Sequence, residues 1–151
     1  MSGRIGSLAA VTAPTSTSAP VESPGYRKLR LRVGGGLVFM AVLHVLVPKQ
    51  FIKIIPKSLG APRFWNLAAG AAEGAAGALL LSSDPQKQKA GGALATATFI
   101  GVYPANINMA IQAGKPTNPA AIAAWLRLPM QFPMIASGIR SRMSAASTVG
   151  P

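Results

Sequence analysis

The side chains able to exchange protons or to orient a polar ligand are few in this sequence, and they lie within apolar stretches. His44 is the only histidine and Glu73 is one of only three acidic residues, and both types accept and release protons. Arginine, asparagine, glutamine and tyrosine side chains can donate hydrogen bonds to a carbonyl oxygen. The candidate ligand-binding residues are His44, Glu73, Tyr103, Asn106, Arg127 and Gln131. The sequence assigns a catalytic role to none of them.

The composition excludes several kinds of redox site. The chain contains no cysteine, so disulfides, thiolate metal sites and cysteine-ligated iron–sulfur clusters are excluded. A single histidine cannot supply both axial ligands of a haem, and we predict no metal site. A redox role would therefore require a diffusible cofactor such as a quinone, or a partner subunit in the membrane.

The overall composition favours an integral membrane protein over a soluble domain. Half of the residues are hydrophobic and only 12% are charged, against about 25% in a typical soluble domain, and the mean hydropathy is +0.37. The formal net charge is +12, but the basic residues fall between apolar runs, as expected beside the lipid bilayer. Because no basic stripe with interleaved aromatic residues is present, no nucleic-acid binding is predicted.

The elements that must position the candidate residues are four apolar segments, at about 33–47, 64–81, 90–113 and 119–139. A bilayer core about 30 Å thick requires about 20 helical residues. The short first segment would therefore need Arg30 and Arg32 to extend their side chains to the head groups. None of the segments has the polar stripe of a soluble amphipathic helix. We predict an all-α fold, a four-helix transmembrane bundle over residues 29–140.

Both ends of the sequence differ in composition from this apolar region. Residues 1–28 are rich in Ser, Thr, Ala and Pro and end in a basic cluster, and residues 141–151 are similarly polar. Both are predicted to be disordered, because they bury too little apolar surface. No apolar core of a secretory signal peptide follows Arg4, but the Ser-rich, acid-poor composition leaves a plastid-type transit peptide open.

The connection between the first two predicted spans carries lysines at four-residue intervals, Lys49, Lys53 and Lys57, with apolar residues between them. This pattern fits a short interfacial helix lying on the head groups. An irregular lysine-containing linker is an equal alternative, because Pro56 interrupts the pattern.

Four spans would place both termini on the same side of the membrane. That side would carry Arg27, Lys28, Arg30, Arg32, Lys87, Lys89, Arg140 and Arg142. Fewer basic residues lie in the opposite loops. The positive-inside rule therefore predicts a multi-pass protein of the cell membrane with both termini in the cytoplasm.

The candidate residues are predicted to meet at one depth in the outer half of the bilayer, because a helix rises about 1.5 Å per residue. Glu73 shares a helix face with Gly70, Gly74 and Gly77, where small residues allow another helix to approach closely. Arg127 carries the opposite charge at a similar depth. We predict that Glu73 and Arg127 pair, directly or through one water molecule.

The stretch YPANINMA, residues 103–110, interrupts the third apolar segment. Pro104 cannot donate to the carbonyl of Ile100, so a kink is predicted there. Freed backbone groups at membrane depth must face protein or water. Asn106 would turn its amide to the same interior, whereas Asn108 would face another direction.

The motifs that contain these residues are HVLVPKQFIKIIP, WNLAAGAAEGAAGALLL, VYPANINMA and LRLPMQ. Together they resemble the DoxX-like family of small four-helix membrane proteins, over about residues 30–140. Val45 stands where similar sequences usually carry an aromatic residue. Some members of that family are described as membrane subunits that accompany thiosulfate:quinone oxidoreductase or quinol-oxidising systems. The resemblance therefore implies an accessory or quinone-linked subunit of a membrane redox system.

The sequence is compatible with three functions. The first is a quinone site, in which Arg127 and the neighbouring amides donate hydrogen bonds and His44 exchanges protons with the outer face. The second is a structural scaffold, in which the same polar groups only clamp the helices together. The third is transport of a small solute or proton, which in so small a bundle would require a homo-oligomer.

Overall fold

The computed structural model describes residues 22–147, and every regular element in this range is a helix. The elements are α1 (Pro24–Leu46), α2 (Pro48–Ile52), the 3-10 helix η1 (Lys57–Leu59), α3 (Pro62–Leu81), α4 (Pro85–Gly101), α5 (Tyr103–Ala113) and α6 (Pro119–Ser147). The predicted all-α class is confirmed. The apolar segments correspond to α1, α3, the α4–α5 unit and α6.

Proline marks the start of nearly every helix. Helices α1, α2, α3, α4 and α6 each begin at a proline, and α5 has Pro104 as its second residue. At these positions the missing N–H is not needed and the fixed φ angle suits a helix. Ser23 and Asp84 cap α1 and α4, because their side-chain oxygens accept hydrogen bonds from backbone N–H groups of the first turn.

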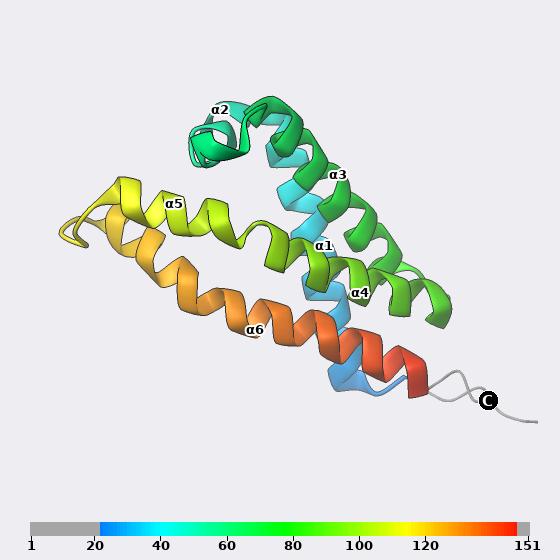
Figure 1. Ribbon diagram of the computed structural model, residues 1–151. Coiled ribbons are helices and arrows are strands. Elements are labelled where there is room, and N and C mark those ends of the chain that lie inside the picture. Colours follow the sequence, from blue (N-terminus) through cyan, green and yellow to red (C-terminus); the bar gives the residue numbers. More distant parts are fainter. Residues whose placement is uncertain (1–21, 148–151) are drawn as a thin grey trace, which may run out of the picture.

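Figure 1 shows two long antiparallel groups, α1 with α3 and the α4–α5 unit with α6, which are joined where α3 packs against α4. Helix α1 makes few contacts with α6. At the end of the bundle where α1 starts, the Tyr26 hydroxyl donates to the Ser141 carbonyl of α6 at 3.1 Å. At the opposite end α5 follows α6 (Figure 1), and Asn108 and Gln112 of α5 donate to the carbonyls of Ile54 and Lys53, directly after α2, at 2.8 and 3.0 Å.

Glycines allow the helices within each group to touch through their backbones. A Cβ atom added to Gly77 of α3 would lie 2.7 Å from the carbonyl oxygen of Gly34 in α1. One added to Gly92 of α4 would lie 2.6 Å from the backbone nitrogen of Arg142 and 2.8 Å from the carbonyl oxygen of Gly138, both in α6. Small residues at helix contacts of this kind are typical of membrane bundles.

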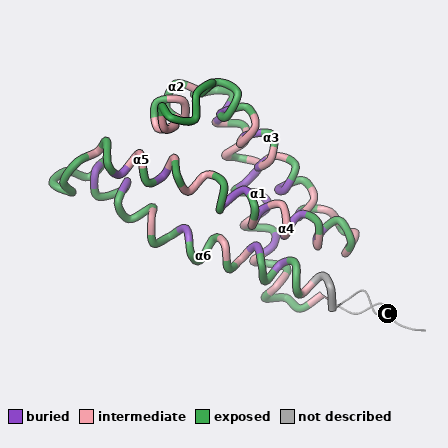
Figure 2. Tube along the Cα trace, viewed as in Figure 1, coloured by how far each residue is buried: buried purple, intermediate pink, exposed green. Residues whose placement is uncertain are grey.

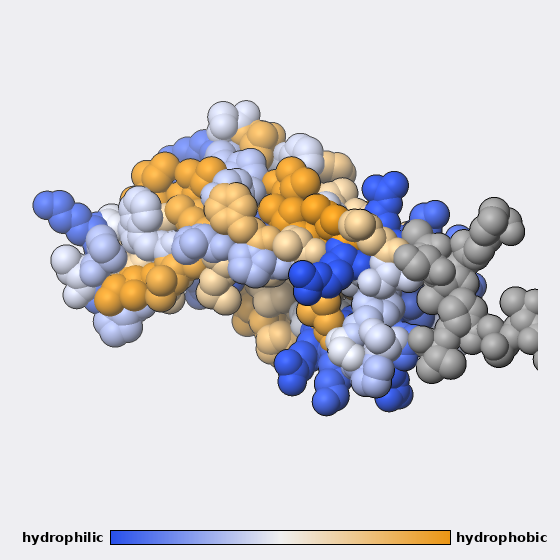
Figure 3. All heavy atoms as spheres, turned by 90° about the horizontal axis from the view of Figure 1, so that it is seen from below, coloured by the Kyte–Doolittle hydropathy of each residue, from blue (hydrophilic) through white to orange (hydrophobic). Residues whose placement is uncertain are grey.

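Polar side chains share the interior with an apolar core of Leu37, Ala76, Leu80, Ala95 and Phe99, and many large apolar side chains are exposed. Figure 2 shows buried positions along the inward faces of the helices and exposed ones along the outward faces. The buried polar and charged residues are Arg30, His44, Asn66, Glu73, Gln88, Thr98, Asn106, Gln131 and Ser141. Figure 3 shows apolar side chains over the middle of one face, with hydrophilic ones gathered mainly toward its ends.

Two helical stretches, α1 and the α4–α5 unit (Pro85–Ala113), are long and apolar enough to cross a membrane. Their outward side chains include Phe39 and Val45 on α1, which are 62% and 69% exposed, and Ile111 on α5, which is 65% exposed. Contiguous exposed apolar surface marks contact with a membrane or a partner. These features support association with a membrane.

The ends of the helical region differ from the prediction. Helix α1 begins at Pro24 and α6 continues to Ser147, so residues 24–28 and 141–147 are helical, not disordered. The reason is tertiary contact, since Tyr26 anchors the start of α1 to Ser141 of α6. The predictions for residues 1–21 and 148–151 lie outside the described residues.

At the position of the predicted kink the helix is interrupted, because Val102 separates α4 from α5. The backbone N–H of Val102 still bonds to the Thr98 carbonyl at 2.9 Å, and that of Asn106 bonds to the Val102 carbonyl at 3.2 Å. The two helices therefore continue in nearly the same direction (Figure 1). The lysine-containing connection also forms a short helix, α2, followed by η1; its place at a membrane interface stays a prediction.

Arg30 does not extend to the head groups as predicted, because its side chain is buried against α3. Its Nε lies 2.7 Å from Oε1 of Glu22, and its Nη1 donates to the carbonyl of Leu80 and, at 3.1 Å, to that of Ser82. The last carbonyls of a helix lack backbone donors and carry partial negative charge. The Arg30 guanidinium therefore caps the C-terminal end of α3.

Replacing Arg30 with glutamine is expected to lower the free energy of unfolding by about 2 kcal/mol, because a hydrogen bond to a charged group contributes about 1.5–3 kcal/mol. Arg27→Gln changes an exposed arginine of the same helix and should cost less than about 0.5 kcal/mol. Unfolding of the purified protein in detergent, followed by circular dichroism, measures both. Equal losses in the two variants would contradict the capping role of Arg30.

Candidate functional site

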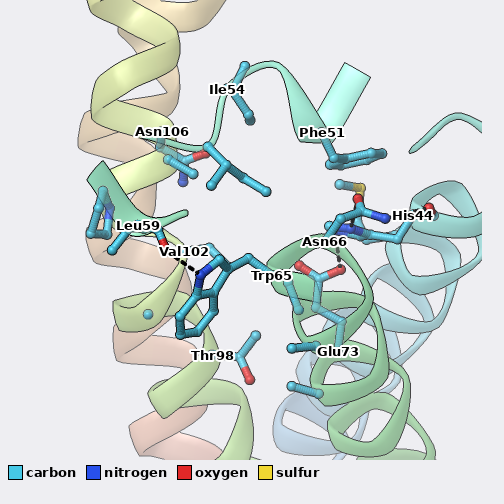
Figure 4. A pocket seen from close by; sticks show the side chains of 18 of the residues that line it. His44, Phe51, Ile54, Leu59, Trp65, Asn66, Glu73, Thr98, Val102 and Asn106 are labelled. Atoms are coloured by element: carbon cyan, nitrogen blue, oxygen red, sulfur yellow. Dashed lines mark hydrogen bonds and ion pairs between the residues drawn. The ribbon is translucent and has the colours of Figure 1, made fainter. Parts of the chain in front are cut away.

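A cavity of about 260 Å³ lies between the α1–α3 group and the α4–α5 unit (Figure 4). Its polar lining residues are His44, Asn66, Glu73, Thr98, Asn106 and Arg127. Its apolar lining includes Met40, Phe51, Ile54, Trp65 and Val102. In Figure 4, His44, Asn66 and Glu73 lie on one side of the cavity, and Val102 and Asn106 lie on the other. An apolar pocket with a few convergent polar groups is the usual form of a small-molecule site.

His44 is held on α1 by its neighbours from α3 and α2. Gly70 gives it room, since a Cβ atom there would lie 2.8 Å from the His44 Cβ. Asn66 donates through Nδ2 to the His44 carbonyl at 3.0 Å, which leaves its Oδ1, 2.9 Å away, to accept from the His44 Nδ1. The Phe51 ring stacks on the imidazole at 3.9 Å between centroids. This arrangement assigns the Nδ1 proton to Asn66 and turns Nε2 toward Glu73.

Glu73 lies next to this imidazole in the interior. Its Oε2 is 3.4 Å from Nε2 of His44, close enough for an ion pair, and the two side chains are 8% and 7% exposed. The same oxygen is buried and accepts no well-aligned hydrogen bond within the described part of the chain. Its partner is the His44 imidazole, and the Glu73 carboxylate is the acidic group of this wall of the cavity.

The predicted direct pair of Glu73 with Arg127 is not formed. Among the described residues the carboxylate of Glu73 pairs with His44, and Arg127 pairs with an amide, although both side chains line the same cavity. Arg127 is also exposed, not strongly buried. The physical reason is that His44 reaches Glu73 across the glycine contact between α1 and α3, whereas α6 lies on the far side of the cavity.

Arg127 begins a chain of side-chain hydrogen bonds that ties α6 to the α4–α5 unit. Its Nε donates to Oδ1 of Asn106 at 3.0 Å, and Nδ2 of Asn106 donates to Oε1 of Gln131 at 3.0 Å. Nε2 of Gln131 then donates to the carbonyl of Phe99, just before the break at Val102. The two Nη nitrogens of Arg127 donate no hydrogen bond to the described residues and remain available to a ligand.

The remaining candidates lie at or beyond the edge of this site. Gln131 supports Asn106 and lines a neighbouring cavity with Glu73 and Arg127. Tyr103 does not line the cavity, because its ring packs edge-on against Phe132 of α6, with centroids 6.3 Å apart. The predicted involvement of Tyr103 is therefore not seen.

The sequence reasoning missed Asn66, which orients His44. A signal was present, since Asn66, Gly70, Glu73 and Gly77 recur at spacings of four, three and four residues on one face of α3. Trp65 also lines the cavity, and its Nε1 donates to the Leu59 carbonyl at 3.1 Å. This bond fixes the segment that follows α2 over the cavity.

The arrangement places hydrogen-bond acceptors and donors on opposite walls. Glu73 with His44 can accept a proton on one wall, and the Arg127 Nη groups can donate to an oxygen on the other. Within residues 22–147, no group of three side chains of the metal-ligating types is found.

Residues 33–142 match the model of a family described as a domain of unknown function (DUF8561). No curated protein and no solved structure matches the chain.

Proposed function

The chain belongs to the DUF8561 family, and we propose that it is a four-helix integral membrane protein whose central cavity binds the head group of a quinone. In this proposal it serves as an accessory subunit of a membrane redox system. The observation that carries the proposal is that the buried carboxylate of Glu73, paired with His44, lines the same cavity as the Arg127 guanidinium.

Helix lengths and exposed side chains support a bundle of four spans. Besides α1 and the α4–α5 unit, α3 has 20 residues and α6 has 29, and about 20 are needed to cross the hydrocarbon core. Leu67 on α3 and Phe132 on α6 are 61% and 65% exposed, positions suited to lipid. The basic residues near the two described ends favour termini in the cytoplasm.

The chemistry of a quinone matches the two walls of the cavity. Its carbonyl oxygens accept hydrogen bonds, for which the Nη groups of Arg127 are suited, and the hydroxyl of the reduced quinol can donate to the carboxylate of Glu73. Oxidation of a quinol releases two protons and two electrons. The Glu73–His44 pair would take up one proton and the other would pass to water, while the electrons would require a partner subunit, because this chain has no cysteine and one histidine.

The resemblance to DoxX-like proteins is a second support for this proposal. The matching motifs contain His44, Glu73, Asn106, Arg127 and Gln131, and some proteins of that family accompany quinone-linked oxidoreductases. The apolar groove between the helices near Phe51 and Trp65 would accommodate the start of an isoprenoid tail.

Quinone that copurifies with the protein tests the proposal. We expect wild-type protein from native membranes to retain quinone at close to one molecule per chain, measured by solvent extraction and chromatography. Glu73→Gln and Arg127→Gln should each lower retention roughly tenfold, because each removes a charge-assisted hydrogen bond. Arg140→Gln, an exposed arginine of the same helix as Arg127, should retain the wild-type amount. Quinone-free wild-type protein would contradict the proposal.

A structural scaffold is the second candidate, favoured by the hydrogen bonds that the polar residues make among themselves. His44 and Asn66 satisfy each other across α1 and α3, and Asn106 joins Arg127 to Gln131 across α5 and α6. On this alternative, Asn66→Leu would lower stability, and no variant would change quinone content. The same extraction therefore separates the two functions.

A further inference from the structure

A second and larger cavity, of about 770 Å³, lies between the α1–α2 end and the α5–α6 end of the bundle. It shares the residues Met40, Phe51, Ile54 and Arg127 with the cavity described above. The two cavities therefore adjoin at these residues. We refer to the second cavity as the α2–α6 groove.

The wall of the α2–α6 groove is apolar along α1, α5 and α6. The residues that supply it are Met40, Leu43, Met109, Ala113, Ala120, Ala121, Ala123 and Ala124. Of the four alanines of α6, Ala120 and Ala123 are exposed, so a longer side chain there would enter the groove. Such a wall suits a flexible hydrocarbon chain, which gains dispersion contacts without a shaped pocket.

The polar residues of the groove gather at helix ends. Lys53 caps the C-terminal end of α2, Gln112 lies in the last turn of α5, and Asn118 directly precedes α6. Gln112 donates to the Lys53 carbonyl at 3.0 Å, which joins the two sides of the rim. The groove thus has a polar rim at the end of the bundle and an apolar wall that leads inward, the arrangement expected for a head group and an acyl chain.

The charges of the groove select the sign of the head group. Lys53 lies at the rim and Arg127 lies deeper, and none of the described residues that line the groove is acidic. An anion at the rim would therefore meet positive charge without a compensating carboxylate. A basic side chain near a membrane surface attracts anionic lipid.

From the charge and shape of the groove, we infer that the α2–α6 groove binds one anionic phospholipid, with its phosphate beside Lys53 and one acyl chain along the alanines of α6. The inference rests on the proposed membrane location but not on the proposed quinone site. Because Lys53 lines only this groove, the two sites can be tested separately.

Native mass spectrometry of the full-length protein in detergent tests this lipid site. The probes are phosphatidylglycerol and phosphatidylcholine with the same acyl chains, added in equal amounts. We expect one phosphatidylglycerol to be retained in preference, and Lys53→Gln to weaken its retention roughly fivefold. Lys57→Gln, in the same segment but outside every cavity described above, should retain it as the wild type does.

A second pair of variants tests the position of the acyl chain. Ala123→Phe should block the groove, whereas Ile122→Phe, at the neighbouring exposed position outside the groove, should leave lipid retention unchanged. The inference would be overturned if the two lipids were retained equally or if the two lysine variants had equal effects. Tighter retention of added oleate, or release of lipid when the protein dimerises, would also overturn it. A chain released from membranes by alkaline carbonate would instead contradict the proposed membrane location.

Discussion

Replacing Glu73 with alanine should lower the free energy of unfolding by about 3–5 kcal/mol, the usual cost of removing one partner from a buried ion pair. The variant leaves Nε2 of His44 facing the cavity without its acceptor, while Nδ1 stays bound to Asn66. Arg127→Ala should cost much less, about 0.6 kcal/mol. It removes one side-chain hydrogen bond, from an exposed arginine.

A double-mutant cycle identifies the true partner of Glu73. The coupling free energy between His44→Ala and Glu73→Ala should exceed about 1 kcal/mol, because the two side chains are in contact. The coupling between Arg127→Ala and Glu73→Ala should be below about 0.5 kcal/mol. Reversible unfolding in mixed micelles measures both cycles. Strong coupling to Arg127 and none to His44 would show that the ion pair described above is not the stabilising one.

The sequence correctly predicted that these polar side chains line one cavity, but the predicted pairing of Glu73 with Arg127 was wrong. Helix rise and facing positions were enough to place Glu73, Asn106 and Arg127 around one cavity. Which residue pairs with Glu73 depends on which helices are in contact. The predicted depths were counted from the ends of the apolar segments, which assumes that these ends lie at the same height in the membrane. Helices α2 and η1 offset the ends of α1 and α3, so His44 reaches the level of Glu73.

Other differences have the same origin in tertiary contact. The first residue of α5 is Tyr103, directly after the break at Val102, and the break directs its ring to Phe132 and not to the cavity. Asn66 follows the same face as Glu73, but its role becomes visible only when His44 is placed opposite it. The all-helical class and the break near Pro104 were predictable, because proline and apolar periodicity act locally.

Replacing Gly92 with leucine should lower the free energy of unfolding by about 3 kcal/mol or more, and little folded protein should survive extraction. A Cβ atom at this position would lie 2.6 Å from the backbone nitrogen of Arg142 and 2.8 Å from the Gly138 carbonyl oxygen. Backbone atoms cannot rotate away as a side-chain end can, so α4 and α6 would have to separate. Overpacking usually costs about 1–3 kcal/mol, and more where nothing can yield.

Gly35→Leu is the matched control, because a Cβ atom there meets no heavy atom within 4 Å. It should raise stability by about 0.5–1 kcal/mol, since glycine is unfavourable inside a helix. Opposite signs at Gly92 and Gly35, measured by unfolding in the same detergent, would establish backbone contact between α4 and α6. That contact also sets Gln131 of α6 within reach of the Phe99 carbonyl of α4. Wild-type stability of Gly92→Leu would therefore contradict both the helix packing and the hydrogen-bond chain that positions Arg127.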